Sequence, residues 1–423
     1  MKTNKFLALL TALVMLLSVA AFAQADEQIT LNFWHIWSTD QMAEIVDEYI
    51  EIFEAEHPNI KIESTATQEV EYQTTKLRIA ASNKSQGDVF FCWGGGYAKD
   101  YVDAGAVLPL DEYFEKYGIH DQILEGTLVN GIYDGKIYGL PLKQWAGVLF
   151  CNQELFDQYG VKIPETWEEM MAAVKTFREN NVTPLVLGAK EAWHIGMIQN
   201  ALAVRTAGVD YVNKALAGEA TLDTAEIVRS AELLVELNEA GAFPKGTLGL
   251  GSEESQEEFM MGMIPMYYAG SWVSSGCDSE DNSIQGKVVV APMPTIEGGL
   301  GDETTYSGGV IDMMMVNAAT QYPDEAFEFA LGMTKYMSEE CYKIGDSLPA
   351  WKLPDIDESE VSPTLINVKN LIQNSTGYVL AWDTFLSGAA IDAHYQLLQG
   401  LIAGTVTPAQ FAAEMQASVE AAK

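Results

Sequence analysis

The spacing of apolar residues changes between two periods along the first hundred positions of the chain. Residues 29–36 are apolar and aromatic, which is typical of a strand. The apolar residues that follow recur at intervals of three and four, as on one face of a helix: Met42, Ile45, Val46, Tyr49, Ile50 and Phe53. Strands are also predicted at 59–64 and 88–92, with a helix at 71–82 between them. This β-α-β-α-β order predicts a mostly parallel sheet covered by helices.

The pattern starts again beyond the break at residues 131–135. We expect a strand at 145–151, a helix opened by the capping pair Thr166 and Glu169, and a short strand at 185–187. A second α/β lobe is therefore predicted to begin near residue 140. The length of the chain agrees, because one core rarely grows past about 250–300 residues and the chain has 423.

The first 25 residues have the pattern of a signal peptide. Lys2 and Lys5 precede an apolar stretch at 6–19, and Ala23-Gln24-Ala25 is typical of a signal-peptidase site. We therefore expect an exported protein, periplasmic or secreted, whose mature chain begins at Asp26. No apolar stretch reaches the ~18 residues of a membrane span, so membrane insertion of the mature chain is not expected. The absence of a cysteine after the stretch argues against a lipid anchor.

Charge and cysteine content exclude several classes of partner. The chain has 24 Lys and Arg against 60 Asp and Glu, a formal net charge of -36, which argues against nucleic acid and anionic membranes. The cysteines are far apart, with no histidine at ligand spacing, so no metal or cofactor is predicted: Cys92, Cys151, Cys277 and Cys341. Export permits disulfides, with three possible connectivities, although apolar surroundings favour buried thiols at Cys92 and Cys151.

Three consecutive glycines follow the strand predicted at 88–92. The run WGGGYAK lacks both the phosphate-loop pattern and G-x-G-x-x-G, which argues against a nucleotide site. Two interpretations remain: a tight turn into the next helix, or bare backbone at Gly94 and Gly95 that a ligand can approach. The neighbouring Trp93 favours a ligand with apolar faces and polar edges, such as a pyranose ring.

Several longer stretches resemble one known family. They are GDVFFCWGGGYAKDYVDAGAVLPLDEYF, DGKIYGLPLKQWAGVLFCNQELFDQYGVKIPETWEEM, FMMGMIPMYYAGSW and SGGVIDMMMVN. These stretches resemble the extracellular solute-binding proteins of carbohydrate ABC transporters, the group that includes the maltose-binding protein. The resemblance covers nearly the whole mature chain, and no single motif decides it.

The resemblance implies an α/β, two-lobed periplasmic-binding-protein fold, with mostly parallel sheets flanked by helices and a ligand cleft between lobes joined by a hinge. The first lobe would contain 26–139 and 303–345, and the second 140–302 and 346–423. The implied function is high-affinity binding of a carbohydrate outside the cytoplasm and its delivery to ABC permease subunits by hinge closure. A monomer without enzymatic activity is expected.

Candidate ligand-binding residues follow from tryptophans that end apolar runs beside glycine, polar or acidic residues: Trp37, Trp93, Trp145, Trp193, Trp272 and Trp382. Each of them is also compatible with a place in the core. Several aromatic platforms together favour an oligosaccharide. Asp383 resembles the family's ligand-binding acid, with a helix cap as the alternative. Weaker candidates are Gln144, His194 and the backbone of Gly94, Gly95, Gly308 and Gly309, whereas His35, His57, His120 and His394 are expected to be structural.

Two other classes remain open. A secreted glycoside hydrolase needs two carboxylates about 5–9.5 Å apart across the scissile bond, and no segment presents such a pair in a recognisable setting. A binding protein for iron or for a cation such as a polyamine is suggested by Tyr267-Tyr268 and by the acidic charge. The tyrosine pair lies within an apolar strand, however, where packing explains it.

Overall fold

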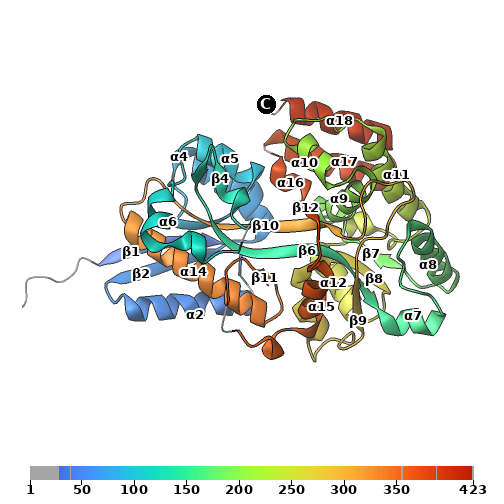
Figure 1. The fold of residues 1–423 in the computed structure, drawn as a ribbon, viewed down its shortest axis with the longest axis horizontal. Coiled ribbons are helices and arrows are strands. Elements are labelled where there is room, and N and C mark those ends of the chain that lie inside the picture. Colours follow the sequence, from blue (N-terminus) through green and yellow to red (C-terminus); the bar gives the residue numbers. More distant parts are fainter. Residues whose placement is uncertain (1–27, 39, 125, 354–355, 387, 422–423) are drawn as a thin grey trace, which may run out of the picture.

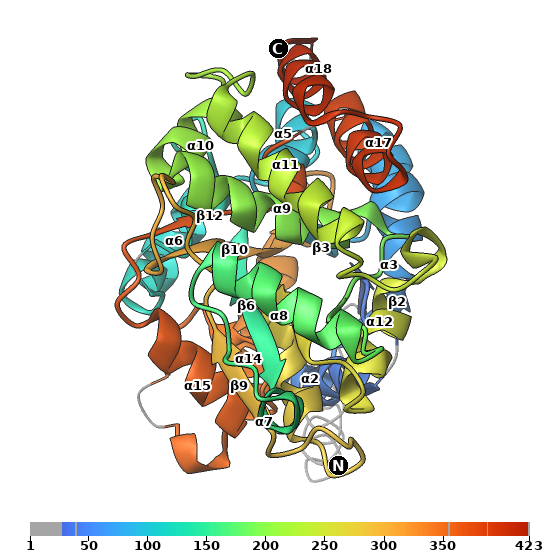
Figure 2. The same cartoon turned by 90° about the vertical axis from the view of Figure 1, so that its right-hand side faces the viewer.

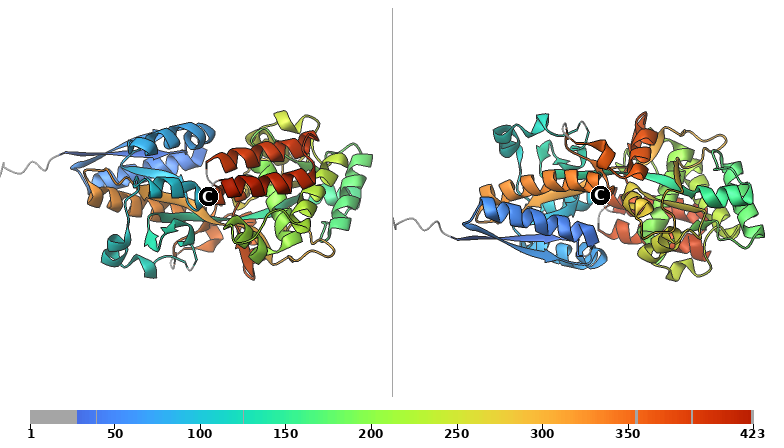
Figure 3. Two further views of the ribbon diagram at one scale, coloured as in Figure 1. Left: turned by 90° about the horizontal axis from the view of Figure 1, so that it is seen from above. Right: turned by 90° about the horizontal axis from the view of Figure 1, so that it is seen from below.

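The computed structural model describes residues 28–38, 40–124, 126–353, 356–386 and 388–421. The predicted signal peptide lies outside the described residues, so its prediction stays open. Two lobes of strands and helices lie end to end along the long axis, and two long strands run from one lobe to the other (Figures 1 and 3). Within the described part of the chain, no helix is both long and apolar enough to cross a membrane.

The first lobe begins with the predicted alternation of strands and helices. Side chains of alternate residues in the first strand enter the core, and Leu31 and Phe33 are completely buried. The predicted helix at 71–82 is present in three continuous pieces, the middle one a π-helical turn. The elements in chain order are β1 (Ile29–His35), α2 (Asp40–Glu56), β2 (Ile60–Ala66), α3 (Glu69–Glu71), η1 (Tyr72–Lys76), α4 (Leu77–Asn83), β3 (Val89–Trp93), α5 (Gly96–Asp103) and α6 (Asp111–Tyr117).

Pairing among β1, β2 and β3 is parallel, as predicted. The strand order is β2-β1-β3, with His35 opposite Ala66 and Trp34 opposite Phe90. Helix α14 (Pro323–Lys343) packs against α2 and β3 although it comes more than 200 residues later in the chain. The carboxyl ends of β1, β2 and β3 therefore meet at one edge of the sheet, and Figure 1 shows that this edge faces the second lobe.

The strands that join the lobes pair differently from the prediction of a mostly parallel sheet. Strand β6 (Leu140–Asn152) leaves the first lobe and β10 (Thr305–Val316) returns to it, so the two run antiparallel, and β10 is also antiparallel to β3. The full order β2-β1-β3-β10-β6-β8-β7 is a mixed sheet. The reason is topological, because a chain that leaves a lobe and comes back must reverse its direction.

The second lobe is built mainly of helices around β6. The predicted helix after Pro164 is α8, and the Thr166 hydroxyl caps it by accepting from the Glu169 amide. Figure 2 looks at this lobe end-on and shows α17 and α18 lying side by side along one edge. Its elements include α7 (Gln153–Tyr159), α8 (Trp167–Glu179), β7 (Leu185–Val186), α9 (Ala192–Ala207), α10 (Val209–Leu216), α11 (Ala225–Glu239), α12 (Ser252–Met260), β8 (Met266–Gly270), η5 (Ser271–Val273), α13 (Ser274–Asp278), β9 (Val288–Ala291), α15 (Pro363–Ile372), α16 (Trp382–Phe385), α17 (Ala389–Ala403) and α18 (Pro408–Ala421).

Short elements complete the junction between the lobes. The hairpin β4 (Ile132–Tyr133) and β5 (Lys136–Ile137) occupies the predicted break, β11 (Leu348–Pro349) pairs with β6, and β12 (Gly377–Val379) pairs with β10. The indole of Trp351 donates to the Pro141 carbonyl at 2.7 Å. The segment after α14 is thus fastened to the strand that leaves the first lobe.

Candidate functional site

The candidate site lies where the carboxyl ends of β1, β2 and β3 face the second lobe. Ligands of open α/β sheets bind at such strand ends. Two predicted tryptophans lie here, and both are largely buried: Trp37 stacks on His35 with ring centres 5.6 Å apart, and Trp93 meets the edge of Phe91 at 4.8 Å. The aromatic packing holds these rings in place and leaves only a small part of each exposed.

The three glycines after Trp93 form the tight turn into α5, the first of the two interpretations, and Gly95 has a φ of 65° there. The Gly94 amide donates to the Ile311 carbonyl at 2.7 Å and the Gly95 amide to the Asn130 carbonyl at 2.8 Å, so neither donor is free for a ligand in this arrangement. A Cβ on Gly95 would lie 2.7 Å from the carbonyl oxygen of Thr384, and one on Gly96 only 1.8 Å from that of Phe385. The bare backbone therefore lets α16 of the second lobe approach the first lobe.

Three tryptophans come together on the second lobe. Trp145 of β6, Trp193 of α9 and Trp272 of η5 are predicted ligand-binding residues from distant parts of the sequence. The ring centre of Trp272 lies 5.4 Å from that of Trp145 and 6.2 Å from that of Trp193, both in edge-to-face contact. Trp145 is largely buried, whereas Trp193 and Trp272 are partly exposed. We call these three residues the tryptophan group.

His194 packs against Trp193 of the tryptophan group. Its Nδ1 accepts from the Gly188 amide at 3.2 Å, which leaves Nε2 to donate to the Tyr268 carbonyl at 3.2 Å. Burial lowers the pKa of His194 to about 4, so the ring is neutral at pH 7. The imidazole stacks on Trp193 at 5.2 Å, and with both nitrogens occupied it acts as a positioning residue for that indole.

Trp382 and Asp383 lie at the start of α16 but face different surroundings. Trp382 is completely buried and stacks on His394 and Phe411, with ring centres 5.7 and 6.3 Å away, so its ring is part of the core of the second lobe. Asp383 is partly exposed and accepts from the Tyr395 hydroxyl at 2.6 Å. Burial raises the pKa of Asp383, and the hydrogen bond from Tyr395 acts in the opposite direction.

The remaining predicted residues lie where β6 and β10 cross. Gln144 donates from Nε2 to the Pro349 carbonyl at 2.8 Å. Gly308 and Gly309 pair with Ala146 and Trp145 and have φ values of 151° and 126°, which L-residues rarely adopt. A Cβ on Gly308 would lie 2.4 Å from the Trp145 carbonyl oxygen, so Gly308 allows the two strands to cross closely, whereas a Cβ on Gly309 would lie 3.0 Å from the Leu380 side chain.

A charged group at the crossing was missed by the sequence reasoning. The Lys143 ammonium lies 2.7 Å from Asp346 Oδ2 and 3.9 Å from Asp312 Oδ2, with all three side chains mostly buried. Burial acts to lower the pKa of Lys143, but the Asp346 and Asp312 carboxylates outweigh it and raise that pKa. Burial raises the pKa of Asp312 to about 6, against the attraction of Lys143. The signal was present, since a charged residue inside an apolar strand, as in LPLKQW or VIDMMM, needs a partner.

Glu69, at the start of α3, was also missed. Its side chain is exposed, yet its pKa is raised to about 7, first by desolvation and then by Asp312, with smaller contributions from Asp383 and Glu253. Lys143 acts in the opposite direction. These charged groups belong to β10, α16, α12 and β6, so the surroundings of the Glu69 carboxylate come from elements far apart in the sequence. No motif marks it, so only the fold identifies it.

Comparison with known proteins decides the family. Residues 37–338 match the family described as "Bacterial extracellular solute-binding protein". The chain belongs to this family. The solute-binding protein is 39% identical, with a TM-score of 0.89, to a structure from work on xylan utilization by Caldanaerobius polysaccharolyticus, over 92% of this chain and 99% of that one. A chitin oligosaccharide binding protein shares the fold, with a TM-score of 0.86 at 24% identity over 93% of this chain and 99% of that one.

Curated relatives include transporter components. The solute-binding protein is 21% identical over 80% of its length, and 78% of the relative, to the "Multiple sugar-binding protein" of Streptococcus mutans serotype c. It is 24% identical over 79% of its length to an uncharacterized ABC transporter extracellular-binding protein of Pyrococcus horikoshii, of which 76% is covered. These relatives are binding proteins, and the two-lobed α/β fold predicted from the sequence is confirmed.

Cysteines and metal ligands complete the description of the site. All four cysteines are buried free thiols, as expected for Cys92 and Cys151. Among the described residues, no group of three or more His, Cys, Asp or Glu could hold a metal ion. Tyr267 and Tyr268 are almost completely buried in β8, and Tyr267 stacks on Phe259 at 5.5 Å, so packing accounts for the pair.

Proposed function

We propose that this solute-binding protein binds an oligosaccharide between its lobes and delivers it to the permease of an ABC importer. The observation that carries the proposal is the tryptophan group, in which two partly exposed indoles, Trp193 and Trp272, lie in edge-to-face contact on the second lobe. Indole faces cover the apolar faces of sugar rings, whereas carboxylates and amides bind the hydroxyls. The 39% identical relative studied for xylan utilization and the sugar-binding relative of S. mutans support a carbohydrate ligand.

Polar partners come from both sides of the space between the lobes. Glu69 lies on the first lobe, whereas Asp383, with its donor Tyr395, lies on the second. Each carboxylate accepts hydrogen bonds from sugar hydroxyls, and charge-assisted bonds of this kind are the stronger ones. A ligand that contacts both sets of residues binds the closed form better than the open form, so it shifts the population towards closure.

We propose that the hinge lies at the crossing of β6 and β10. Gly308 and Gly309 absorb backbone rotation more easily than other residues, and the register of the two strands is irregular on both sides of Asp312. The lobes would then comprise 26–139 with 303–345, and 140–302 with 346–423. We further propose a monomer that is periplasmic or secreted without a lipid anchor and has no enzymatic activity.

Calorimetry with a glycan panel tests this function. The panel contains xylo-oligosaccharides, chito-oligosaccharides, raffinose and stachyose, and small-angle scattering follows the radius of the protein with each glycan that binds. We expect tight binding of at least one oligosaccharide and a smaller radius in its presence. New reducing ends after incubation would favour the hydrolase, a coloured protein would favour iron, and tight binding without a change in radius would contradict hinge closure.

A further inference from the structure

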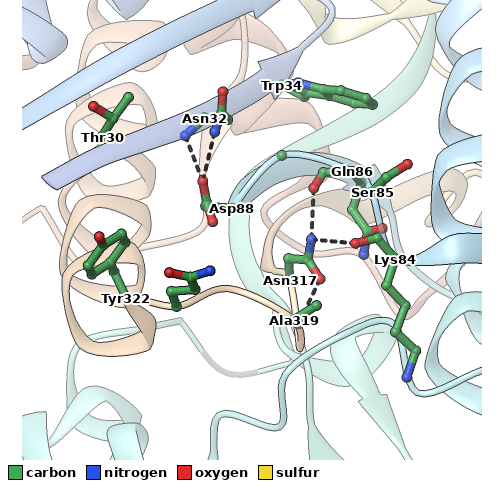
Figure 4. Close-up of a pocket in the computed structure, with 12 residues that line it drawn as sticks. Thr30, Asn32, Trp34, Lys84, Ser85, Gln86, Asp88, Asn317, Ala319 and Tyr322 are labelled. Carbon is green, nitrogen blue, oxygen red and sulfur yellow. Dashed lines mark hydrogen bonds between the residues drawn. The ribbon is translucent and has the colours of Figure 1, made fainter.

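A separate cavity lies on the first lobe, away from the candidate site. It has a volume of about 470 Å³, which is within the ~300–1,000 Å³ typical of small-molecule sites. Its lining comes from alternate residues along β1, namely Thr30, Asn32 and Trp34, from the turn before β3, and from the loop that follows β10. Because β1 and β3 are parallel and β10 is antiparallel to β3, the turn before β3 and the loop after β10 lie at the edge of the sheet opposite the strand ends of the candidate site, and Trp34 extends the lining along β1 (Figures 1 and 4).

Hydrogen bonds fix the walls of this cavity. Asp88 accepts from the amide and the side chain of Asn32, at 2.8 and 3.1 Å, and from the Thr320 hydroxyl at 2.7 Å. Asn317 donates to the carbonyls of Gln86 and Lys84, at 2.7 and 3.2 Å, as Figure 4 shows. The walls are thus held in position without any ligand.

Trp34 forms the aromatic part of the lining. Figure 4 shows it on the same strand as Thr30 and Asn32, beside the turn that contains Gln86. A Cβ on Gly87 would lie 2.9 Å from Cδ1 of Trp34 and 2.7 Å from the Asn32 carbonyl oxygen, so only glycine fits here without displacing the indole. The ammonium of Lys76 lies 4.3 Å from the ring centre. Trp34 is therefore fixed between neighbours and remains partly exposed.

Neutral hydrogen-bonding groups in the lining are free. Within the described part of the chain, the hydroxyls of Thr30, Ser85 and Tyr322 and the side-chain amide of Gln321 have no hydrogen-bond partner. The other polar side chains of the lining, Asp88 and Asn317, already have hydrogen-bond partners within the protein. A bound molecule would thus find both donors and acceptors that need no rearrangement.

The charges of the lining exclude other ligand classes. An anion would meet Lys84 in the lining and Lys76 beside Trp34, but also the Asp88 carboxylate, on a chain with a net charge of -36. A metal ion would need Asp88, whose two oxygens already accept three hydrogen bonds. An apolar ligand would leave the free hydroxyls and amide without partners. A neutral, polyhydroxylated molecule satisfies the lining best.

We propose that this cavity is a second carbohydrate site, which binds one sugar unit independently of the space between the lobes. A single ring offers few contacts, so the dissociation constant is expected on the order of millimolar. Because the two sites lie at opposite edges of the sheet, both can be occupied at once. A weak site of this kind would hold the protein near a polymer while the space between the lobes remains available for a released oligosaccharide.

Fluorine NMR of the mature protein labelled with 5-fluorotryptophan tests the proposal. The Trp34 signal is assigned with Trp34→Phe, and D-xylose, D-glucose, D-galactose and N-acetylglucosamine are each titrated beyond millimolar concentration. We expect at least one sugar to shift the Trp34 signal in a millimolar phase. Gln321→Ala should weaken that phase about three- to tenfold. Thr30→Tyr, which fills the cavity from an exposed strand position, should abolish it.

Two controls separate this site from the proposed function. Gln373→Ala alters another exposed glutamine, which does not line the cavity, and should leave the millimolar phase unchanged. Trp272→Ala should weaken tight oligosaccharide binding while the Trp34 phase remains. The proposal is overturned if no sugar moves the Trp34 signal, or if Thr30→Tyr retains the wild-type response, because the shift would then originate elsewhere.

Discussion

Replacing Gly270 by alanine should displace Trp272 without removing it. A Cβ at this position would lie 1.9 Å from Cζ3 and 2.2 Å from Cε3 of the indole. Carbon atoms that are not bonded rest about 3.5–4 Å apart, so the ring must move by roughly 1.5–2 Å. The backbone does not oppose the change, because φ and ψ at Gly270 are -75° and 163°, values that alanine adopts readily.

The expected loss of affinity follows from the area of one stacked sugar. An indole that covers a sugar ring removes roughly 50–80 Å² of apolar surface from water, which at about 25 cal/mol per Å² is worth about 1.3–2 kcal/mol. Gly270→Ala should therefore weaken oligosaccharide binding about tenfold or more, close to the effect of Trp272→Ala. Crowding of the ring should cost at most about 1–3 kcal/mol of stability.

Calorimetry with the oligosaccharide found in the panel measures the affinity, and a urea titration of the unliganded protein measures its stability. The matched control is Gly249→Ala, because a Cβ there meets no atom within 4 Å and should change neither quantity. Wild-type affinity in Gly270→Ala would refute a stacking role for Trp272. A loss of stability near the ~3–5 kcal/mol typical of a deleted core aromatic would instead assign that indole to the core.

Three further outcomes are expected. Asp312→Asn should change how stability depends on pH. In the wild type the pKa of Asp312 is about 6 in the folded state against an ordinary 3.8, so the folded state binds more protons between these two pH values. The free energy of unfolding of the wild type therefore falls by about 3 kcal/mol as the pH rises from 3.8 to about 6. The variant should not show this fall in urea titrations, and parallel pH profiles would contradict the assignment. Asp383→Asn should weaken sugar binding by about 1.5–3 kcal/mol, with apo melting nearly unchanged; unchanged affinity with lower melting would make it a structural residue. Lys143→Met leaves the carboxylates of Asp312 and Asp346 buried without their cation and should destabilise the protein by about 3–5 kcal/mol. Chemical denaturation at pH 7 measures this loss, and a midpoint near that of the wild type would show that these ion pairs contribute little to stability.

The regular elements of the fold were predictable because their patterns are local. The helical face from Met42 to Phe53 is α2, and the capping pair Thr166 and Glu169 opens α8. The burial of the Trp382 ring could not be predicted from the sequence. Trp382 ends an apolar run as Trp272 does, yet its ring packs on α17 and α18, which come later in the chain. Local sequence contains no information about such neighbours.

The polar part of the site was the least predictable. Gly94 and Gly95 were expected to leave backbone donors for a ligand, but their amides bond to carbonyls of residues far away in the sequence. Glu69 follows no motif, and its surroundings arise only when β2, β10 and α16 are brought together. Charge on an apolar strand, as at Lys143, indicated that a partner must exist without indicating which one.

The chain leaves the first lobe along β6 and returns to it along β10, and this order delays completion of the first lobe during folding. The first lobe is complete only after β10 has paired with β3, and the bond between Asp88 and Thr320 joins residues 232 positions apart. Trp351 and Pro141, 210 positions apart, close the junction in the same way. Contacts of such long range slow folding. An amino-terminal segment that emerges first therefore has no complete sheet to form until β10, which begins at Thr305, is available to pair with β3.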